Sequence, residues 1–449
     1  MERRDFIKNS GLAAAGLLIA PSLDLSGKKK PFVIILGGGL AGLSAAYRLK
    51  KENIPFVVLE ARNRLGGRVL THTLDEKEDL TCELGAEWIG KSHTKIQGLC
   101  NEFGLEMLDH QYDTHLVLNE QHFRPGQWSY ETGYEKYEAA RKGFLNLPEK
   151  EAMKMDKQDW WRYLNNLGVS ERDLEIKELL DSTDFGESIR NVSAYSAMSE
   201  YAYSSEKNEM DYWIKGGNSQ LINAMKNFIG EDSVRTGHQV EKVVQDGKKI
   251  KVYCRNGFTV SGDKMICTVP VYALHKIRWE PAFPDAQQEA LNELQYARIM
   301  KTSILFNRRF WEDESFDMIT DTPGQYFFHA TKLQKSEKGI LTSYTIGDKA
   351  YALSKMNRKQ KEEMIASSLR TAFGDVMPHV DNSIAYYWGS DIHTHGAYAI
   401  YDTRQWFSVR PLLREPFRNI YFAGEHLADW QGFMEGAIET GFEAAEKII

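Results

Sequence analysis

The feature that most constrains this chain is a strand, a glycine-rich loop, a helix and a second strand that follow one another between residues 33 and 60. Residues 33–36 form a continuous apolar run, which is typical of a strand buried in a parallel sheet. The loop then reads Gly-Gly-Gly-Leu-Ala-Gly, residues 43–50 have helical composition, and residues 56–59 form a second apolar run that ends in Glu60. This order predicts a Rossmann-like α/β dinucleotide-binding unit, in which the Glu60 carboxylate accepts both ribose hydroxyls.

The glycine-rich loop has the spacing that a pyrophosphate requires. Gly37 permits a tight turn, Gly39 lets phosphates approach the backbone, and Gly42 allows the helix to pack closely on the strand. Leu40 and Ala41 lie between these glycines, and the helix over residues 43–50 follows, whose N-terminus attracts negative charge. We therefore predict that all of these residues belong to the cofactor site.

The composition indicates a globular protein and excludes several other classes. The 449 residues include 56 Lys and Arg and 63 Asp and Glu, for a net charge of −7, and 42% of them are hydrophobic. At roughly 150 residues per domain, this length predicts two or three domains. A mildly acidic chain lacks the basic surface that holds nucleic acid, so no nucleic acid is expected as a partner. The four cysteines show neither a disulfide framework nor metal-ligand spacing.

Residues 1–30 differ from the rest of the chain because a charged block, an apolar block and a second charged block follow one another. The apolar block, residues 11–20, is too short to cross a hydrocarbon layer of roughly 30 Å, which favours an export signal over a membrane anchor. The segment resembles a bacterial twin-arginine leader, whose Arg-Arg-x-Phe-x-Lys pattern is met by Arg3, Arg4, Phe6 and Lys8. We expect export to the periplasm by the twin-arginine machinery. A frayed helix or a short anchor is the alternative.

A second glycine pair follows Glu60, because residues 60–68 read Glu-Ala-Arg-Asn-Arg-Leu-Gly-Gly-Arg. This pattern resembles the flavin amine oxidase superfamily, which includes monoamine oxidases, polyamine oxidases and L-amino acid oxidases. The resemblance implies FAD as the cofactor, with this glycine pair and its arginines along the pyrophosphate and the flavin. The residues that it assigns to FAD are Ala61, Arg62, Gly66, Gly67 and Arg68.

Further segments that resemble the family occur up to the C-terminus. Residues 83–88 resemble the segment beside the flavin ring, and Val240 the position whose backbone contacts adenine. Residues 420–422 form an apolar strand before Glu425, whose carboxylate can bind cofactor hydroxyls. The last helix directs its N-terminus at the ring, where negative charge develops on reduction. The residues assigned here are Gly85, Ala86, Glu87, Trp88, Val240, Gly424, Glu425, Phe433 and Met434.

Four residues carry the catalytic chemistry that the resemblance implies. Lys301 aligns with a lysine that holds a water against flavin N5, and Trp388 with an aromatic ring laid against the flavin. Tyr398 and Phe433 match the walls of an aromatic cage, which turns the α-C–H of a neutral amine towards N5. Taken singly, Lys301 has the alternative of a solvated surface lysine, and each aromatic residue that of an ordinary core residue.

The chain after residue 30 is predicted to form two discontinuous domains. The FAD-binding domain, Rossmann-like and similar to that of glutathione reductase, comprises residues 31–90, 214–300 and 390–449. The substrate-binding domain is α+β and comprises residues 91–213, an inserted helical region, and residues 301–389, whose alternating strands would complete a sheet over the flavin.

Two departures from the family pattern affect the predicted chemistry. Ala397 occupies the place where mammalian-type monoamine oxidases bond the flavin through a cysteine, so FAD is expected to be non-covalent. Glu87 and Trp88 replace a Met-Arg pair whose arginine grips the substrate carboxylate in many L-amino acid oxidases. This weakens the amino-acid interpretation without removing it, because Arg190, Arg298 or another basic residue of the helical region could supply the same contact.

His393 and His395, with Asp391, offer a metal site as an alternative use of that segment. Residues two apart on a strand face the same way, but no third ligand with recognisable spacing accompanies the histidines. We therefore expect no metal.

The resulting hypothesis is FAD-dependent oxidation of a small-molecule amine. A hydride equivalent passes from the α-carbon to N5, and the imine is hydrolysed to a carbonyl compound and ammonia or a smaller amine. Molecular oxygen would reoxidise the flavin and yield hydrogen peroxide. The alternatives are oxidation of an L-amino acid, a dehydrogenase that passes electrons to a cytochrome or quinone, and a flavin-binding protein without turnover. The oligomeric state is left open, with a homodimer as one candidate.

Overall fold

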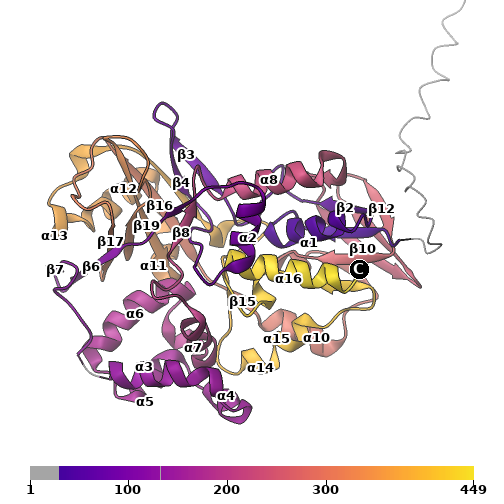
Figure 1. Cartoon of the computed structure of the whole chain (residues 1–449), viewed down its shortest axis with the longest axis horizontal. Coiled ribbons are helices and arrows are strands. Elements are labelled where there is room, and N and C mark those ends of the chain that lie inside the picture. Colours follow the sequence, from indigo (N-terminus) through magenta and orange to yellow (C-terminus); the bar gives the residue numbers. More distant parts are fainter. Residues whose placement is uncertain (1–29, 132) are drawn as a thin grey trace, which may run out of the picture.

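The structure, a computed structural model, describes residues 30–449 with the exception of residue 132. The predicted export leader therefore lies outside the described residues, apart from its last position. Within the described part, no helix is long and apolar enough to cross a membrane. Figure 1 shows a parallel sheet and its helices on the right, a second sheet on the left, and a group of helices below that second sheet.

A five-stranded parallel sheet forms the predicted dinucleotide-binding half, in the order β22-β13-β1-β2-β9. Every residue of β1 and β2 is buried, because helices cover one face of the sheet and a four-stranded sheet packs on the other. The strand bounds are β1 (Val33–Leu36), β2 (Phe56–Leu59), β9 (Val234–Arg235), β13 (Lys264–Cys267) and β22 (Ile420–Phe422).

The first and last helices of the described chain pack on each other beside this sheet (Figure 1). They are α1 (Leu40–Lys51) and α16 (Met434–Glu446), with α8 (Ser219–Ile229) beside α1. The close approach of α16 to α1 requires a glycine, because a Cβ on Gly441 would lie 2.3 Å from the carbonyl oxygen of Ala41. Residues from both ends of the chain thus share one core, with Leu43 and Ile438 fully buried.

The second half is built on a seven-stranded sheet in the order β20-β16-β19-β18-β17-β6-β7. The register places Lys301 of β16 opposite Tyr344 of β19 and Tyr386 of β20, and Tyr326 of β18 opposite Tyr344. Directly opposite residues share a face, so these four side chains form one row. The bounds are β6 (Asp113–Leu118), β7 (Gln121–Phe123), β16 (Ile299–Phe306), β17 (Phe316–Thr320), β18 (Tyr326–His329), β19 (Gly339–Ile346) and β20 (Val380–Tyr387).

The segment predicted as a helical insert contributes strands as well as helices. Strand β6 pairs in parallel with β17, and β7 completes the edge of the sheet, so this part of residues 91–213 belongs to the sheet layer. The helices follow as α3 (Tyr134–Gly143), α4 (Glu149–Met155), α5 (Trp160–Leu167), α6 (Glu171–Phe185) and α7 (Ala194–Tyr203).

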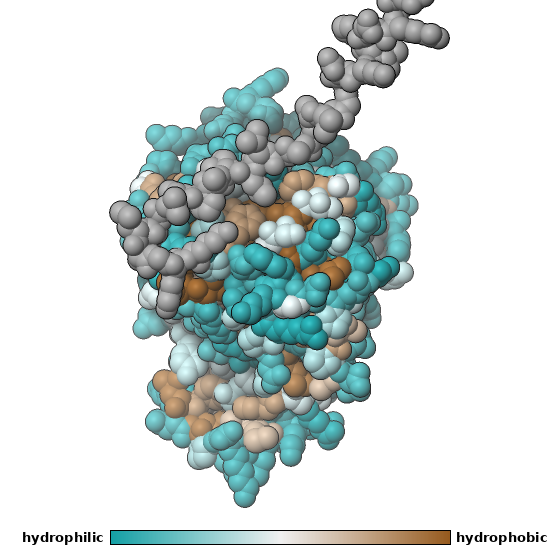
Figure 2. Space-filling view, turned by 90° about the vertical axis from the view of Figure 1, so that its right-hand side faces the viewer, coloured by the Kyte–Doolittle hydropathy of each residue, from teal (hydrophilic) through white to brown (hydrophobic). Residues whose placement is uncertain are grey.

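Local sequence explains where these helices begin and end. Asp159, Ser170 and Ser193 precede α5, α6 and α7, and each side chain accepts a backbone hydrogen bond from the first turn. Gly168 and Gly186 follow α5 and α6 in the left-handed conformation that ends a helix. Figure 2 shows a mostly hydrophilic face on which hydrophobic residues lie in separate groups, some at mid-height and some nearer the lower end.

Smaller elements connect the two halves. A four-stranded sheet in the order β12-β11-β10-β14 lies against the parallel sheet, and short two-stranded sheets pair β3 with β4, β5 with β8, and β15 with β21. Their bounds are β3 (Thr71–Asp75), β4 (Leu80–Glu83), β5 (Met107–Asp109), β8 (Tyr212–Ile214), β10 (Val240–Asp246), β11 (Lys249–Cys254), β12 (Thr259–Gly262), β14 (Arg278–Glu280), β15 (Gln295–Tyr296) and β21 (Ala399–Ile400). The remaining helices are α2 (Thr94–Glu102), α9 (Val271–Leu274), α10 (Asp285–Glu293), α11 (Gly347–Ser354), α12 (Arg358–Ser367), α13 (Arg370–Phe373), α14 (Gln405–Ser408) and α15 (Arg410–Arg414).

Candidate active site

One cavity of about 510 Å³ is lined by both halves of the molecule. This volume is in the range of small-molecule and cofactor sites, at about 300–1,000 Å³. The lining includes the loop after β1, the ends of β2 and β22, the start of α16, the central strands of the seven-stranded sheet, and helices α6 and α7. The cavity therefore joins the predicted dinucleotide site to the predicted substrate site.

Every residue that the sequence assigns to the cofactor or to catalysis lines this cavity, with the exception of Gly42. Gly42 lies behind the loop, where an added Cβ would be 2.0 Å from the carbonyl oxygen of Gly37. This contact supports the close packing at the start of α1 that the sequence predicts for Gly42. Its membership of the cofactor site stays a prediction.

The start of α1 offers unpaired backbone donors to an anion. Gly39 precedes the helix with extended backbone, and no side chain caps α1. The first turn of a helix carries N–H groups without intrahelical acceptors, so the N-terminus is suited to a phosphate. A Cβ added to Gly67 would lie 3.2 Å from the Cα of Gly39. The backbone N–H of Gly66 donates to the Gly38 carbonyl oxygen at 2.9 Å. The two glycine pairs together form a cradle without side chains, and this fits a pyrophosphate.

Glu60 is placed at the end of β2, as a ribose-binding acid requires. Its Oε2 accepts from the backbone N–H of Gly38 at 2.7 Å, and Oε1 from that of Arg62 at 2.7 Å. A carboxylate has about four acceptor positions, so lone pairs remain for hydroxyl groups. These bonds also tie β2 to the glycine-rich loop.

The arginines of the second glycine motif are held by carboxylates of the C-terminal segment. Arg62 makes a bidentate pair with Asp391 at 2.9 and 2.6 Å, and Arg68 Nη1 lies 2.6 Å from Glu425 Oε1. Burial raises the pKa of Glu425, but Arg68 outweighs burial, so the pKa lies below its usual value. Both pairs cross from the first part of the chain to the last and join the two parts of the cofactor site.

The segment considered for a metal has other partners in the structure. Asp391 is engaged by Arg62 and by the Tyr386 hydroxyl at 2.7 Å, and the His395 ring stacks on Tyr272 at 4.2 Å. His393 lines the cavity.

The predicted aromatic cage lies at the substrate end of the cavity. Tyr398 donates its hydroxyl hydrogen to the carbonyls of Thr183 and Asp184 at the end of α6. The ring of Tyr398 lies 2.9 Å from the Cβ position of Gly432, next to Phe433. Trp388 is 2% exposed and donates from Nε1 to the Leu84 carbonyl at 2.8 Å. The Tyr398 ring therefore packs on the glycine that precedes Phe433, and both predicted cage residues line the cavity.

Lys301 lies in the lining as a buried ammonium with a partner that the sequence did not indicate. Its Nζ is 2.6 Å from Oε2 of Glu87, and both side chains are 3% exposed. The structure thus shows Glu87 in an ion pair with Lys301. The resemblance separately implies that Glu87 lies beside the flavin. Nζ also lies 5.7 Å from the Trp88 ring and 5.9 Å from the Tyr344 ring.

A set of carboxylates in the substrate half was missed by the sequence reasoning. Burial and then Asp181 raise the pKa of Asp184 to about 7, and burial raises the pKa of Asp317 to about 7. Burial, Asp184 and Glu209 raise the pKa of Glu200 well above its usual range. Such shifts mark carboxylates without sufficient positive charge nearby. The spacing of Asp181 and Asp184, three residues apart on a helix, was the available signal, because it places both on one face.

The cationic side chains of the same lining are already engaged. Of the six Lys and Arg residues that the structure places there, five have a carboxylate partner within 3.3 Å and Lys276 donates to the Ile392 carbonyl at 3.0 Å. Arg190 and Arg298, the candidates for a substrate carboxylate, do not line the cavity: Arg190 lies over the Trp161 ring and Arg298 pairs with Glu187 and Asp348. Neither arginine is therefore placed to make the predicted contact.

The parallel sheet and two helix N-termini meet at one cavity, beside a buried lysine among aromatic rings, and this arrangement fits a dinucleotide cofactor. The chain belongs to the family "Flavin containing amine oxidoreductase", which it matches over residues 40–449. This membership confirms the resemblance seen in the sequence and implies FAD as the cofactor. It also makes the protein an enzyme of the class that acts on CH–NH₂ groups.

Known L-amino-acid oxidases and known amine oxidases both resemble this chain. The L-amino-acid oxidase of Echis ocellatus is 26% identical over 93% of this chain and 88% of its own, and that of Mus musculus is 28% identical over 96% and 73%. Wild-type putrescine oxidase bound to putrescine aligns with a TM-score of 0.82 at 21% identity, over 94% of this chain and 99% of its own. Cyclohexylamine oxidase from Brevibacterium oxydans IH-35A aligns with a TM-score of 0.82 at 19% identity, over 94% and 99%. These structures confirm the predicted α/β fold.

Proposed function

We propose that this protein oxidises an amine that carries no carboxylate, at the carbon next to nitrogen, and that oxygen accepts the electrons to give hydrogen peroxide. FAD, when bound, supplies the hydride acceptor. The chain's own residues bind and orient the amine: Tyr398 and Phe433 form the walls, and Lys301 lies in the wall beside them. The imine product is hydrolysed to a carbonyl compound and ammonia or a smaller amine.

The charge of the cavity lining is the observation that carries this proposal. A substrate carboxylate needs a free guanidinium or ammonium, and the cations described in the lining are engaged, five of them by carboxylates. The acids Asp184, Glu200 and Asp317 have no ion-pair partner among the described residues, although neutral groups donate hydrogen bonds to Asp184 and Asp317, and their pKa values are raised. The L-amino-acid oxidase relatives keep amino acids as the competing substrate class, but this lining supports a cationic amine over a zwitterion.

The same acids favour an amine with a second positive charge. Asp184 lies at the end of α6, where the adjoining carbonyl accepts the Tyr398 hydroxyl, so its carboxylate is next to the cage. No described residue donates a hydrogen bond to the Glu200 carboxylate, and Oδ1 of the 1% exposed Asp317 has no partner. A distal ammonium would supply the missing counter-charge. Putrescine, bound by the structurally similar oxidase, has this character, and we propose a diamine as the preferred substrate.

Anaerobic bleaching of the flavin separates these substrate classes. We expect an aliphatic diamine to bleach the flavin fastest, a monoamine of equal chain length to bleach it more slowly, and the matching α-amino acid not to bleach it. Faster bleaching by lysine than by its decarboxylated diamine would reverse the assignment. Admitting air then tests the acceptor, because rapid return of the colour with peroxide formation indicates an oxidase, whereas slow return indicates a dehydrogenase that uses a cytochrome or quinone.

FAD is expected to leave the protein on denaturation. Ala397 lines the cavity where a cysteine would be needed for a covalent bond, and the four cysteines, Cys82, Cys100, Cys254 and Cys267, are buried outside the lining. Acid precipitation should therefore release the yellow colour into the supernatant. Colour that remains in the pellet after washing would show a covalent bond and overturn this proposal.

We also propose that the protein is exported to the periplasm by the twin-arginine machinery. The support is the Arg3-Arg4-x-Phe6-x-Lys8 pattern and the short apolar block that follows it. Export in the folded state would let FAD be loaded before the protein leaves the cytoplasm.

A further inference from the structure

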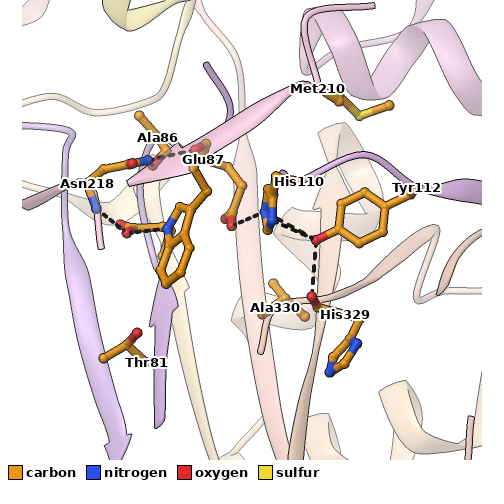
Figure 3. A network of polar contacts seen from close by, with 12 residues as sticks. Thr81, Ala86, Glu87, His110, Tyr112, Met210, Asn218, His329 and Ala330 are labelled. Carbon is orange, nitrogen blue, oxygen red and sulfur yellow. Dashed lines mark hydrogen bonds and ion pairs between the residues drawn. The ribbon is translucent and has the colours of Figure 1, made fainter. Parts of the chain in front are cut away.

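A line of buried polar side chains runs from the cavity wall into the interior. Glu87 Oε2 faces Lys301 Nζ at 2.6 Å, and Glu87 Oε1 faces Nε2 of His110 at 3.2 Å. The Tyr112 hydroxyl lies 3.2 Å from the His110 ring nitrogens and donates to the His329 carbonyl at 3.1 Å. Figure 3 shows Glu87, His110, Tyr112 and His329 in this order. Lys301 and Glu87 lie at the cavity, whereas His110 and Tyr112 lie behind them.

The backbone of Glu87 is fixed by its surroundings. Gly85 packs so closely that a Cβ would lie 1.9 Å from the Arg68 carbonyl, and Ala86 N donates to the same carbonyl at 3.0 Å. The Asn218 amide donates to the carbonyls of Ala86 and Glu87 at 3.0 and 2.7 Å (Figure 3). The position of the Glu87 carboxylate therefore follows from the loop that leads to the cofactor site.

Glu87 remains ionised although it is buried. Burial raises the pKa of Glu87, but Lys301 and His110 together outweigh burial, so the pKa lies below its usual value. An ionised carboxylate only accepts hydrogen bonds, so His110 donates from Nε2. Two donors thus hold the carboxylate, one on each oxygen.

Lys301 keeps donors free for the cavity. An ammonium has three N–H bonds, and Glu87 is its one acceptor among the residues that the structure describes. The other neighbours of Nζ are the aromatic rings of Trp88, Phe328 and Tyr344 at 5.5 to 5.9 Å. Rings attract a cation but do not replace a counter-ion in the interior.

We propose that Glu87 is a positioning residue that supplies the counter-charge for the Lys301 ammonium and holds it at the cavity wall beside the flavin. The inference rests on the proposed function, because it requires bound FAD. It goes beyond that function by naming Glu87 as the residue that keeps a positive charge, the Lys301 ammonium, beside the flavin. A fixed ammonium would stabilise negative charge that builds up on the ring, at any pH at which Glu87 is ionised. Without Glu87, the ammonium keeps no carboxylate partner among the described residues, and burial then disfavours the charged form.

The other titratable groups that face the pair have to be separated from it. Burial raises the pKa of Cys82 to about 12 and, with Glu87, that of Glu83 to about 7. Burial also raises the pKa of Tyr112 and of Tyr344. Glu83 is therefore the neighbour whose own titration would overlap the neutral range, and the substitution E83Q removes it.

The test uses sulfite, an anion whose sulfur lone pair adds to flavin N5 and leaves negative charge on the ring, so that no turnover is involved. Sulfite affinity of the FAD-loaded protein is measured for wild type and for E87Q between pH 6 and pH 9. We divide the sulfite affinity of E87Q by that of wild type at each pH and expect this ratio to fall about tenfold or more from pH 6 to pH 9. A Lys301 side chain that loses its proton in E87Q no longer makes a charge-assisted interaction with the adduct. The same fall is expected when E83Q/E87Q is compared with E83Q. E87D, which keeps a carboxylate, should show a smaller fall.

The double variant E87Q/K301M separates a charge effect from a structural one. It lacks both ionisable groups, so its affinity ratio to wild type should not depend on pH. A ratio for FAD-loaded E87Q that is equally flat would overturn the inference. If E87Q yields no loaded protein, K301Q replaces it: affinity about tenfold or more below wild type is expected, and wild-type affinity would overturn the inference. Wild-type protein that takes up no FAD would instead overturn the proposed function.

Discussion

Replacing Gly42 with valine is expected to produce a protein that takes up almost no FAD. A Cβ at this position would lie 2.0 Å from the Gly37 carbonyl oxygen and 3.1 Å from the Gly37 carbonyl carbon. Both atoms belong to the backbone, so α1 or the glycine-rich loop has to move. Overpacking of this kind costs about 1–3 kcal/mol or more, and each 1.4 kcal/mol is about tenfold in affinity. Because the displaced loop carries the phosphate-binding amides, we expect the loss to appear as reduced FAD affinity.

The measurement is the visible flavin absorbance of the purified protein relative to its protein absorbance, with FAD added back in a titration. Gly98 provides the control, because it is an exposed helical glycine in α2 whose added Cβ meets nothing within 4 Å. The substitution G98A should leave FAD content unchanged. Wild-type FAD affinity in G42V would show that the loop tolerates the displacement and would contradict the packing role of Gly42.

Removing the acids beside the aromatic cage is expected to reduce selectivity for diamines by about 30-fold or more. The substitutions D184N and E200Q keep shape and remove charge. Loss of one partner from a buried charged contact costs about 2–5 kcal/mol, which corresponds to about 30-fold or more. The effect should appear in kcat/KM for a diamine and be small for a monoamine of the same length, because the monoamine has no distal ammonium. Steady-state peroxide formation with both substrates measures it.

Glu206 is the matched control for these two substitutions. It lines the same cavity but is exposed, so solvent screens its charge. The substitution E206Q changes the net charge by the same amount and should alter the diamine-to-monoamine ratio little. An equal loss for both substrates in D184N and E200Q would indicate that these acids support the fold and do not recognise the second ammonium.

The dinucleotide half of the site was predictable because its signals are local. Strand, loop, helix and acid follow one another within residues 33–60, and each residue type has one physical reason to be there. Gly42 illustrates this: its place in the motif predicts close packing, and an added Cβ there would lie 2.0 Å from the Gly37 carbonyl oxygen.

The substrate half was less predictable because its contacts join distant parts of the chain. Glu87 and Lys301 are 214 residues apart, and their ion pair depends on the register of β16 and on the loop after β4. Asp184 and Asp317 come from a helix and a strand of different segments, and both lie close enough to Tyr326 to raise its pKa further after burial. The helical appearance of residues 91–213 likewise concealed β6 and β7, whose pairing with β17 is visible only in three dimensions.

The packing of α16 on α1 has a consequence for biosynthesis. Strand β22 and helix α16 complete the parallel sheet and the flavin end of the cavity, and Glu425 is the partner of Arg68. The phosphate-binding loop leaves the ribosome long before these residues are made. A nascent chain therefore lacks one wall of the cofactor site until synthesis has passed β22 and α16. Uptake of the cofactor thus reports that the chain has been made through α16.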